Sequence, residues 1–157
     1  MLRTIIGRQS FHSSAITRVE KKASPEFSAE SVSQRLGVSF ITPDILQRAL
    51  THKSFKHGSI PTNERLTALG GRVISLFATE KAFQNNAEDI AQQVGEHTNQ
   101  IQLASVFDTL NLEPGLQYDL RDGATTKVKA DAYRAVVGAI YHDKGFSTAR
   151  EFVQKHL

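Results

Sequence analysis

Histidines are the side chains of this sequence best suited to bind a metal or to transfer protons near neutral pH. The chain has six of them and no cysteine. His52, His57, His97 and His142 fall in separate segments, without an HExxH pattern or another paired ligand spacing. The lack of cysteine excludes thiol catalysis, thiolate metal sites and disulfide scaffolds. We interpret the histidines as structural or surface side chains and expect no cofactor.

Two other common chemistries have no sequence signature here. Neither the GxGxxG nor the GxxxxGK phosphate-binding pattern occurs in the chain. A serine hydrolase signature is also missing. Nucleotide-binding loops and acyl transfer are therefore not predicted.

The basic charge of the chain is concentrated in its first 22 residues. The 157 residues include 19 Lys and Arg against 16 Asp and Glu, for a formal net charge of +3 and a pI near 9.3. Residues 1–22 contain five basic residues and one acid, which leaves 14 basic and 15 acidic residues in 23–157. Bulk charge therefore predicts no broad basic face on the remainder of the chain.

The N-terminal segment has the composition of a mitochondrial targeting sequence. It is rich in Ser and Arg, and it spaces apolar residues among the basic ones, as a cationic amphipathic helix does. Arg8, Phe11 and Ser14 resemble the two-step processing pattern of mitochondrial precursors, with a first cut near Phe11 and a second near Arg18. The alternative interpretation is a disordered basic tail without a targeting role.

This composition divides the chain into three parts. We expect a transit peptide over 1–18, a linker over 19–27 and one domain over 28–157 that resides in the mitochondrial matrix. The domain is long enough to bury a core without disulfides or structural zinc. Its apolar runs are too short to span a bilayer, so no membrane partner is expected.

The hydrophobic spacing after the linker is helical throughout, with no lasting alternation typical of strands. Ser28 is suited to cap a first helix that Gly37 ends, and Thr42 with Pro43 and Asp44 is suited to begin a second. The segment EPGLQYDLRDG is predicted to be a loop. We predict an all-α domain with helices over about 28–36, 43–52, 62–84, 87–100, 101–111, 127–142 and 147–157.

Three segments, in this order and spacing, resemble the ribonuclease III catalytic domain over most of residues 40–155. They are LQRALTHKSF, ending at Phe55, NERLTALGGRVI at 63–74 and KADAYRAVVGAIYHDKGFSTAREFV at 129–153. The resemblance implies a ribonuclease III catalytic-domain-like helical fold. It also implies a relation to enzymes that hydrolyse double-stranded RNA with divalent metal ions held between carboxylates.

The carboxylates that this resemblance implies are mostly missing. In the family, acids follow the first Glu at three and seven residues, and a later helix supplies an Asp and a Glu three apart. In this chain the series begins with Glu64 but continues with Thr67 and Gly71, and Asp131 is followed by Arg134. Three of the four principal metal-binding positions thus lack a carboxylate, and we expect that the protein is not an enzyme. The alternative is a nuclease that borrows acids from a partner subunit.

The two remaining acids, Glu64 and Asp131, would face each other at a relict site. Like charges in a partly buried place are costly, so a neighbouring cation is expected to compensate them. Arg134, or Arg72 on the adjoining helix, is suited to do this through a charge-assisted hydrogen bond. The simple alternative is that both carboxylates face water.

Gly70 and Gly71 stand inside a predicted helix, where each costs about 1 kcal/mol relative to alanine. Since the family dimerises through this region, a close helix approach at a subunit interface would explain them. Phe55, Leu69 and Phe77 are candidate apolar anchors near that interface. The alternatives are a local kink for the glycines and ordinary core positions for the apolar residues.

The resemblance, the targeting segment and the missing acids together favour a non-catalytic structural component of the mitochondrial large ribosomal subunit. The expected partners are mitochondrial rRNA, other large-subunit proteins and a second ribonuclease III-like subunit that completes a heterodimer. The alternatives are a mitochondrial ribonuclease III-type enzyme that processes double-stranded RNA, and a free RNA-binding assembly factor.

Affinity for RNA phosphates comes chiefly from lysine and arginine side chains. Candidates lie in the turn after the second predicted helix and around the late loop. Their simple alternative is solvated surface charge. The candidate RNA contacts are Lys53, Lys56, Arg121, Lys127 and Lys129.

Overall fold

The computed structural model describes residues 27–156, which form a helical domain without strands in that range. The predicted transit peptide and nearly all of the predicted linker lie outside these residues. Within these residues, the β-type pairing is a single isolated bridge between Thr51 and Gln117. The all-α prediction is confirmed. The elements are α1 (Ala29–Leu36), α2 (Pro43–Ala49), η1 (Phe55–Gly58), α3 (Glu64–Gln84), α4 (Ile90–Thr98), α5 (Gln100–Thr109), η2 (Glu113–Gly115), α6 (Thr126–Lys144) and α7 (Phe146–His156).

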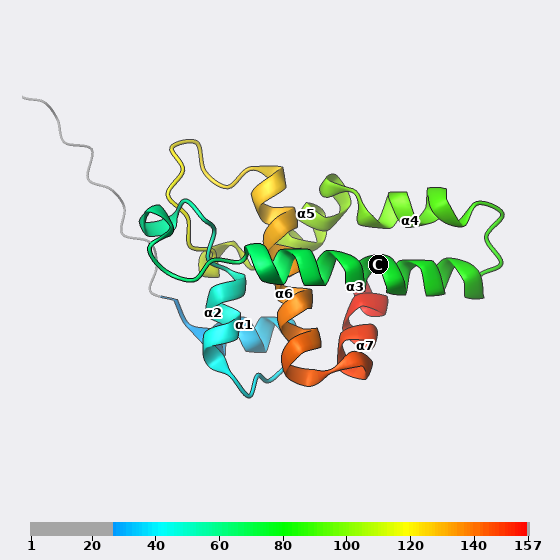
Figure 1. Cartoon of the computed structure of the whole chain (residues 1–157), viewed down its shortest axis with the longest axis horizontal. Helices are drawn as coiled ribbons and strands as arrows, with labels where there is room; N and C mark the ends of the chain where they lie inside the picture. Colours follow the sequence, from blue (N-terminus) through cyan, green and yellow to red (C-terminus); the bar gives the residue numbers. More distant parts are fainter. Residues whose placement is uncertain (1–26, 157) are drawn as a thin grey trace, which may run out of the picture.

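Two long helices, α3 and α6, cross at the centre of the domain (Figure 1). The crossing brings the two backbones into direct contact at Gly70 and Gly138. A Cβ on Gly70 would overlap the carbonyl oxygen of Arg134, and one on Gly138 would overlap the carbonyl oxygen of Leu66. The close helix approach that Gly70 permits is therefore made within the chain, and the predicted subunit contact at Gly70 stays a prediction.

The core surrounds α6, which has neighbours on most of its sides. All of residues 128–140 except Lys129, Asp131 and Arg134 are buried, because α2, α3, α5 and α7 pack around this helix. Phe77 of α3 is fully buried and meets the ring of Phe146 edge-on, with the centroids 5.1 Å apart. Phe77 is thus a core residue, which corrects its prediction as an interface anchor.

The sequence signals at the start of the domain correspond to real helix ends. The Ser28 hydroxyl accepts a hydrogen bond from the Ser31 N–H, and Gly37 ends α1 in the left-handed conformation. Helix α2 begins after Thr42, but its hydroxyl makes no capping bond. Instead, the Asp143 carboxylate from the end of α6 accepts hydrogen bonds from the N–H groups of Ile41 at 2.7 Å and Thr42 at 3.2 Å.

Helix α2 ends at Ala49, three residues before the predicted end. The chain turns there because Leu50 and His52 pair with the segment that follows η2. The Gln117 N–H donates to the Leu50 carbonyl at 2.8 Å, and the His52 N–H donates to the Gln117 carbonyl at 2.9 Å. This pairing carries residues 51–54 towards the beginning of α3.

The far half of α3 and the antiparallel α4 form a helical hairpin that extends from the body (Figure 1). Helix α4 has no buried residue, so the hairpin has little core of its own. No helix of residues 27–156 is long and apolar enough to cross a membrane.

Candidate functional site

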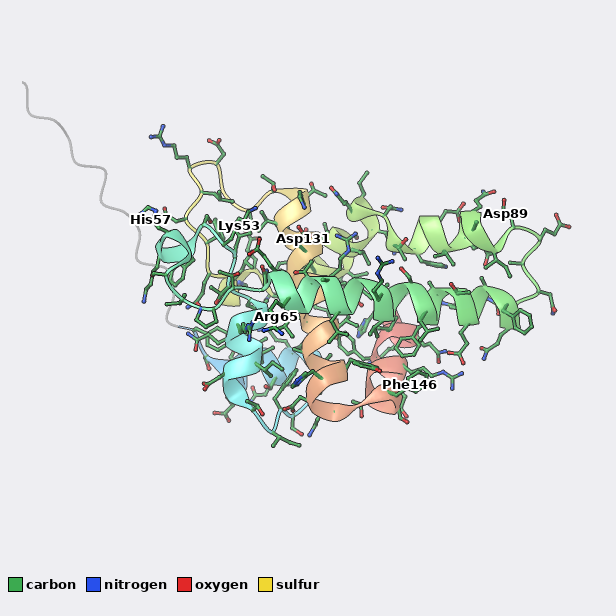
Figure 2. The ribbon with its side chains drawn as sticks, in the orientation of Figure 1. Lys53, His57, Arg65, Asp89, Asp131 and Phe146 are labelled. Atoms are coloured by element: carbon green, nitrogen blue, oxygen red, sulfur yellow. The ribbon has the colours of Figure 1, made fainter. Side chains whose placement is uncertain are left out.

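The first turns of α3 and α6 lie side by side and bring the relict acid positions together. Thr67 marks the contact, because its hydroxyl donates to the Asp131 backbone carbonyl at 3.1 Å. Figure 2 shows Asp131 beside the beginning of α3, at the end of the molecule that also carries Lys53 and His57. The helical pairing thus places the positions selected from the sequence at one site.

Asp131 is paired with two cations from its own helix. The Lys127 ammonium lies 2.7 Å from one carboxylate oxygen, and the Arg134 guanidinium lies 2.9 Å from the other. The side chains of Asp131 and Arg134 are about one-quarter and one-fifth exposed, at 23% and 19%. Such partly buried, charge-assisted hydrogen bonds are stronger than exposed ion pairs.

The Arg134 side chain also links α6 to α4. Its other terminal nitrogen donates to the Thr98 carbonyl, 3.1 Å away at the end of α4. Helix C-termini leave carbonyl groups unpaired and carry partial negative charge, so this position favours a cation. Between the two candidates for the compensating charge, Arg134 and Arg72, it is Arg134 that contacts the carboxylate.

Glu64 differs from Asp131 because its side chain is exposed and unpaired with any cation among the described residues. A hydroxyl of Thr62 donates to one Glu64 oxygen at 3.3 Å. The interpretation that both acids face water therefore holds for Glu64 and fails for Asp131. The two acids do not share one environment.

His52 lies close enough to Asp131 and Glu64 for both charges to affect its pKa. The sequence did not indicate this proximity. Burial and the Lys53 charge lower the pKa of His52, and Asp131 and Glu64 oppose them. Its Nδ1 accepts a hydrogen bond from the Ser54 N–H at 3.2 Å and lies 2.8 Å from the Ser54 hydroxyl. The TH-x-S spacing of the turn was the available signal, but only the fold shows that this turn borders α3 and α6.

The residues at this site do not fit a divalent metal ion. A hard cation needs several free oxygen ligands in near-octahedral geometry. Both oxygens of Asp131 are taken by cations, Thr67 offers a hydroxyl that donates elsewhere, and Gly71 has no side chain. Within residues 27–156, no group of three or more His, Cys, Asp or Glu side chains could hold a metal.

The predicted RNA contacts fall into two groups. Lys53, Lys56 and Arg121 are exposed, and Lys127 keeps 67% of its side chain exposed although it pairs with Asp131. Lys129 is only 18% exposed and binds Asp108 at 2.8 Å and Glu113 at 3.2 Å. Both acids compete with RNA phosphates for the charge of Lys129, and its role as an RNA contact stays a prediction.

The remaining interface candidates, Phe55, Leu69 and Gly71, are half-buried. On α3, Leu76 and Phe83 are large apolar side chains that are 54% and 73% exposed. An exposed apolar pair on one helix is a better anchor for a partner than the buried Phe77 is.

Known proteins match this chain in sequence and in fold. The Ribonuclease-III-like family matches residues 42–157. Ribonuclease 3 of Bdellovibrio bacteriovorus is 33% identical over 140 residues, which cover 82% of this chain and 60% of the relative. Ribonuclease 3 of Thermobifida fusca is 33% identical over 126 residues, with 73% and 52% covered. The chain thus spans between half and about three-fifths of the length of these curated relatives.

Solved structures agree with this result. The nuclease domain of ribonuclease III from Campylobacter jejuni superposes with a TM-score of 0.74 at 29% identity, covering 80% of this chain and 90% of that one. A second structure of that domain describes flexibility in a region involved in dimer formation. It has a TM-score of 0.74 at 28% identity and covers 83% and 99% of the two chains.

These relatives overturn one expectation. The expectation of a structural component of the mitochondrial large ribosomal subunit is wrong, since the matching relatives are named Ribonuclease 3 and favour the nuclease-type alternative. The helical fold, the order of the three motifs and the match over residues 42–157 show that this chain belongs to the ribonuclease-III-like family.

Proposed function

We propose that this chain acts in ribonuclease III-type processing of double-stranded RNA as an RNA-binding domain that does not complete a metal site by itself. The observation that carries the second half of this proposal is the pairing of Asp131 with both Lys127 and Arg134. A carboxylate already neutralised by two cations has little affinity left for magnesium. Cleavage would then require acids that a partner supplies.

The cations around the site support contact with RNA phosphates. Lys53 and His57 lie on the turn beside the start of α3, and Arg65 projects from its first turn (Figure 2). Arg121 is exposed on the loop before α6. A duplex of A-form RNA is recognised mostly through its shape, phosphates and 2′-hydroxyls, and a few clustered cations serve that purpose without a broadly basic surface.

A second ribonuclease III-type domain is the partner that best fits the proposal. A solved relative has a region involved in dimer formation. In this chain the half-buried Phe55 and Leu69 and the exposed Leu76 offer apolar surface for such a contact. We place this chain in a heterodimer, because two copies of it would still lack the missing acids.

A binding and cleavage assay with a labelled RNA duplex tests the proposal. The purified full chain is incubated with the duplex in magnesium or manganese, and bound and cleaved RNA are separated on native and denaturing gels. We expect salt-sensitive binding without cleavage. Lys53→Gln combined with Arg65→Gln should weaken binding about tenfold, whereas the matched control Lys155→Gln should not.

Restoring the acids provides the complementary experiment. In the variant Thr67→Glu, Gly71→Asp and Arg134→Glu, metal binding measured by calorimetry should appear or rise sharply. Its control carries Thr67→Gln, Gly71→Asn and Arg134→Gln, which match the shapes without the charges. Cleavage by the wild-type chain that Asp131→Asn abolishes would refute the claim of an incomplete metal site.

We also propose that residues 1–18 direct the chain to the mitochondrial matrix, on the basis of their basic, acid-poor composition. A fluorescent protein fused after residue 22 should accumulate in mitochondria. Changing Arg3, Arg8 and Arg18 to Glu should leave it in the cytosol. Cytosolic fluorescence of the unchanged fusion would contradict the proposal.

A further inference from the structure

A cleft of about 660 Å³ lies between α2 and the turn that leads to α3. Pockets that hold small organic ligands in proteins commonly span about 300–1,000 Å³. One wall is a single face of α2, because Asp44, Gln47 and Arg48 recur at helical spacing. The opposite wall includes Lys56, Ile60 and Pro61. Lys56 is among the predicted RNA contacts, and the other residues of the lining are not.

Two cations line the cleft and have no carboxylate partner among the described residues. The Arg48 Nε–H donates to the Thr62 carbonyl at 3.3 Å, which orients the guanidinium and leaves its terminal amino groups without a partner in residues 27–156. The Lys56 ammonium lies 5.5 Å from the ring centroid of Phe55, so its nearest described partner is an aromatic ring. An oriented guanidinium beside a lysine is suited to bind a phosphate group.

The turn that presents Lys56 has an unusual backbone. Lys56 and His57 have φ angles of 46° and 54°, both in the left-handed region, and Gly58 follows with 71°. Each non-glycine residue there costs about 1–2 kcal/mol. Such local strain tends to occur where a protein positions a functional group. Here the turn brings the Lys56 side chain to the cleft opposite Arg48.

The rest of the lining fits a base better than it fits a bare ion. Ile45, Ile60 and Pro61 give apolar surface on which a flat ring can lie. Asp44 lies one helical turn before Arg48 on α2. Its carboxylate repels a phosphate from its end of the cleft, and it can accept hydrogen bonds from the N–H groups of a base. Guanine presents adjacent imino and amino donors, whereas uracil has no amino group.

From this arrangement we infer that the cleft binds a nucleotide, with its phosphate between Arg48 and Lys56 and its base between the apolar wall and Asp44. The ligand is either a free nucleotide or one nucleotide of an RNA strand, since both offer the same phosphate and base. Because the cleft contains none of the relict acids, the inference does not depend on RNA cleavage or on its absence.

Calorimetry and amide chemical shifts of the full chain test this inference with defined probes. Guanosine 5′-monophosphate should bind at least about tenfold more tightly than inorganic phosphate, guanosine or uridine 5′-monophosphate does. Its largest shifts should fall on residues 44–61. A 5′-phosphorylated single-stranded RNA hexamer distinguishes the sources: tighter binding of the hexamer identifies an RNA strand, and equal binding identifies a free nucleotide.

Variants separate this cleft from general basic attraction. Arg48→Gln and Lys56→Gln should each weaken nucleotide binding about tenfold, while Lys155→Gln should leave it unchanged. Arg48→Gln also removes the hydrogen bond to the Thr62 carbonyl and could unfold the chain for that reason. Ile60→Glu leaves that bond in place and should still abolish nucleotide binding. Equal affinity for phosphate and the nucleotide, or binding that survives both Arg48→Gln and Ile60→Glu, would overturn the inference. Duplex binding through Lys53 and Arg65 should persist in Ile60→Glu, so failure here is distinct from failure of the proposed function.

Discussion

Alanine at Gly70 should destabilise the protein, although alanine is the better helix former. The added methyl group would overlap the carbonyl oxygen of Arg134 in α6 and would lie 2.7 Å from the Gly138 nitrogen. These are backbone atoms inside a helix, so they cannot move aside as the end of a flexible side chain can. Helices α3 and α6 would have to separate at their crossing.

The size of the effect follows from two opposing terms. Replacing glycine by alanine in a helix gains about 1 kcal/mol. Overpacking a core typically costs about 1–3 kcal/mol, and a rigid backbone neighbour places this site at or above the upper end. We expect a net loss of about 2 kcal/mol or more in the free energy of unfolding, or about 4–8 °C in Tm.

The neighbouring glycine provides a matched control. A Cβ on Gly71 would meet only the Arg134 Cδ at 3.7 Å, an ordinary contact distance. Gly71→Ala should therefore stabilise the protein by up to about 1 kcal/mol. Urea unfolding followed by circular dichroism measures both variants. Equal stability of Gly70→Ala and Gly71→Ala would mean that the two backbones do not touch in solution.

Three further predictions concern charged residues. Arg134→Gln should lower the free energy of unfolding by about 1–3 kcal/mol, because Asp131 and the end of α4 lose a shared donor; unchanged urea unfolding would mean that the pairing is not formed in solution. Although desolvation opposes the shift, the hydrogen bonds from Ile41 and Thr42 hold the pKa of Asp143 below its ordinary value. The stability that ionised Asp143 contributes is thus present above about pH 4 and is lost as pH falls through the lowered pKa. In thermal melts, wild type and Asp143→Asn should differ by about 1 kcal/mol or less in stability at pH 7 and should converge in acid. Lys129→Gln should lower Tm without changing RNA affinity, and an RNA-binding loss equal to that of Lys53→Gln would contradict the assignment of Lys129 to its two acids.

His52 adds a pH dependence at higher pH. Burial, together with the Lys53 charge, lowers the pKa of His52 in the folded protein, so the folded state binds this proton less readily than the unfolded state does. Stability should be complete above pH 6.5 and decline as pH falls from there towards the lowered pKa. His52→Gln should flatten this part of the profile in urea unfolding, and an unchanged slope would contradict the effect of burial.

The helical class and most helix positions follow from local rules in the sequence. Ser28 and Gly37 bound α1 because capping and left-handed geometry depend on adjacent residues, which sequence alone displays. The end of α2 could not be found this way, since it depends on Gln117, which is far along the chain. The exposure of Leu76 and Phe83 could not be predicted for a related reason: a helical period does not tell how much of the helix its neighbours cover.

At the candidate site too, some features follow from the sequence and others only from the tertiary structure. The sequence itself shows that Thr67, Gly71 and Arg134 stand where the resemblance implies acids. Tertiary structure alone decided that Arg134 compensates Asp131 while Glu64 stays exposed, and that Gly70 serves a crossing inside the chain. Those outcomes depend on which backbone lies opposite each residue, and that is determined only when α3 and α6 pack together.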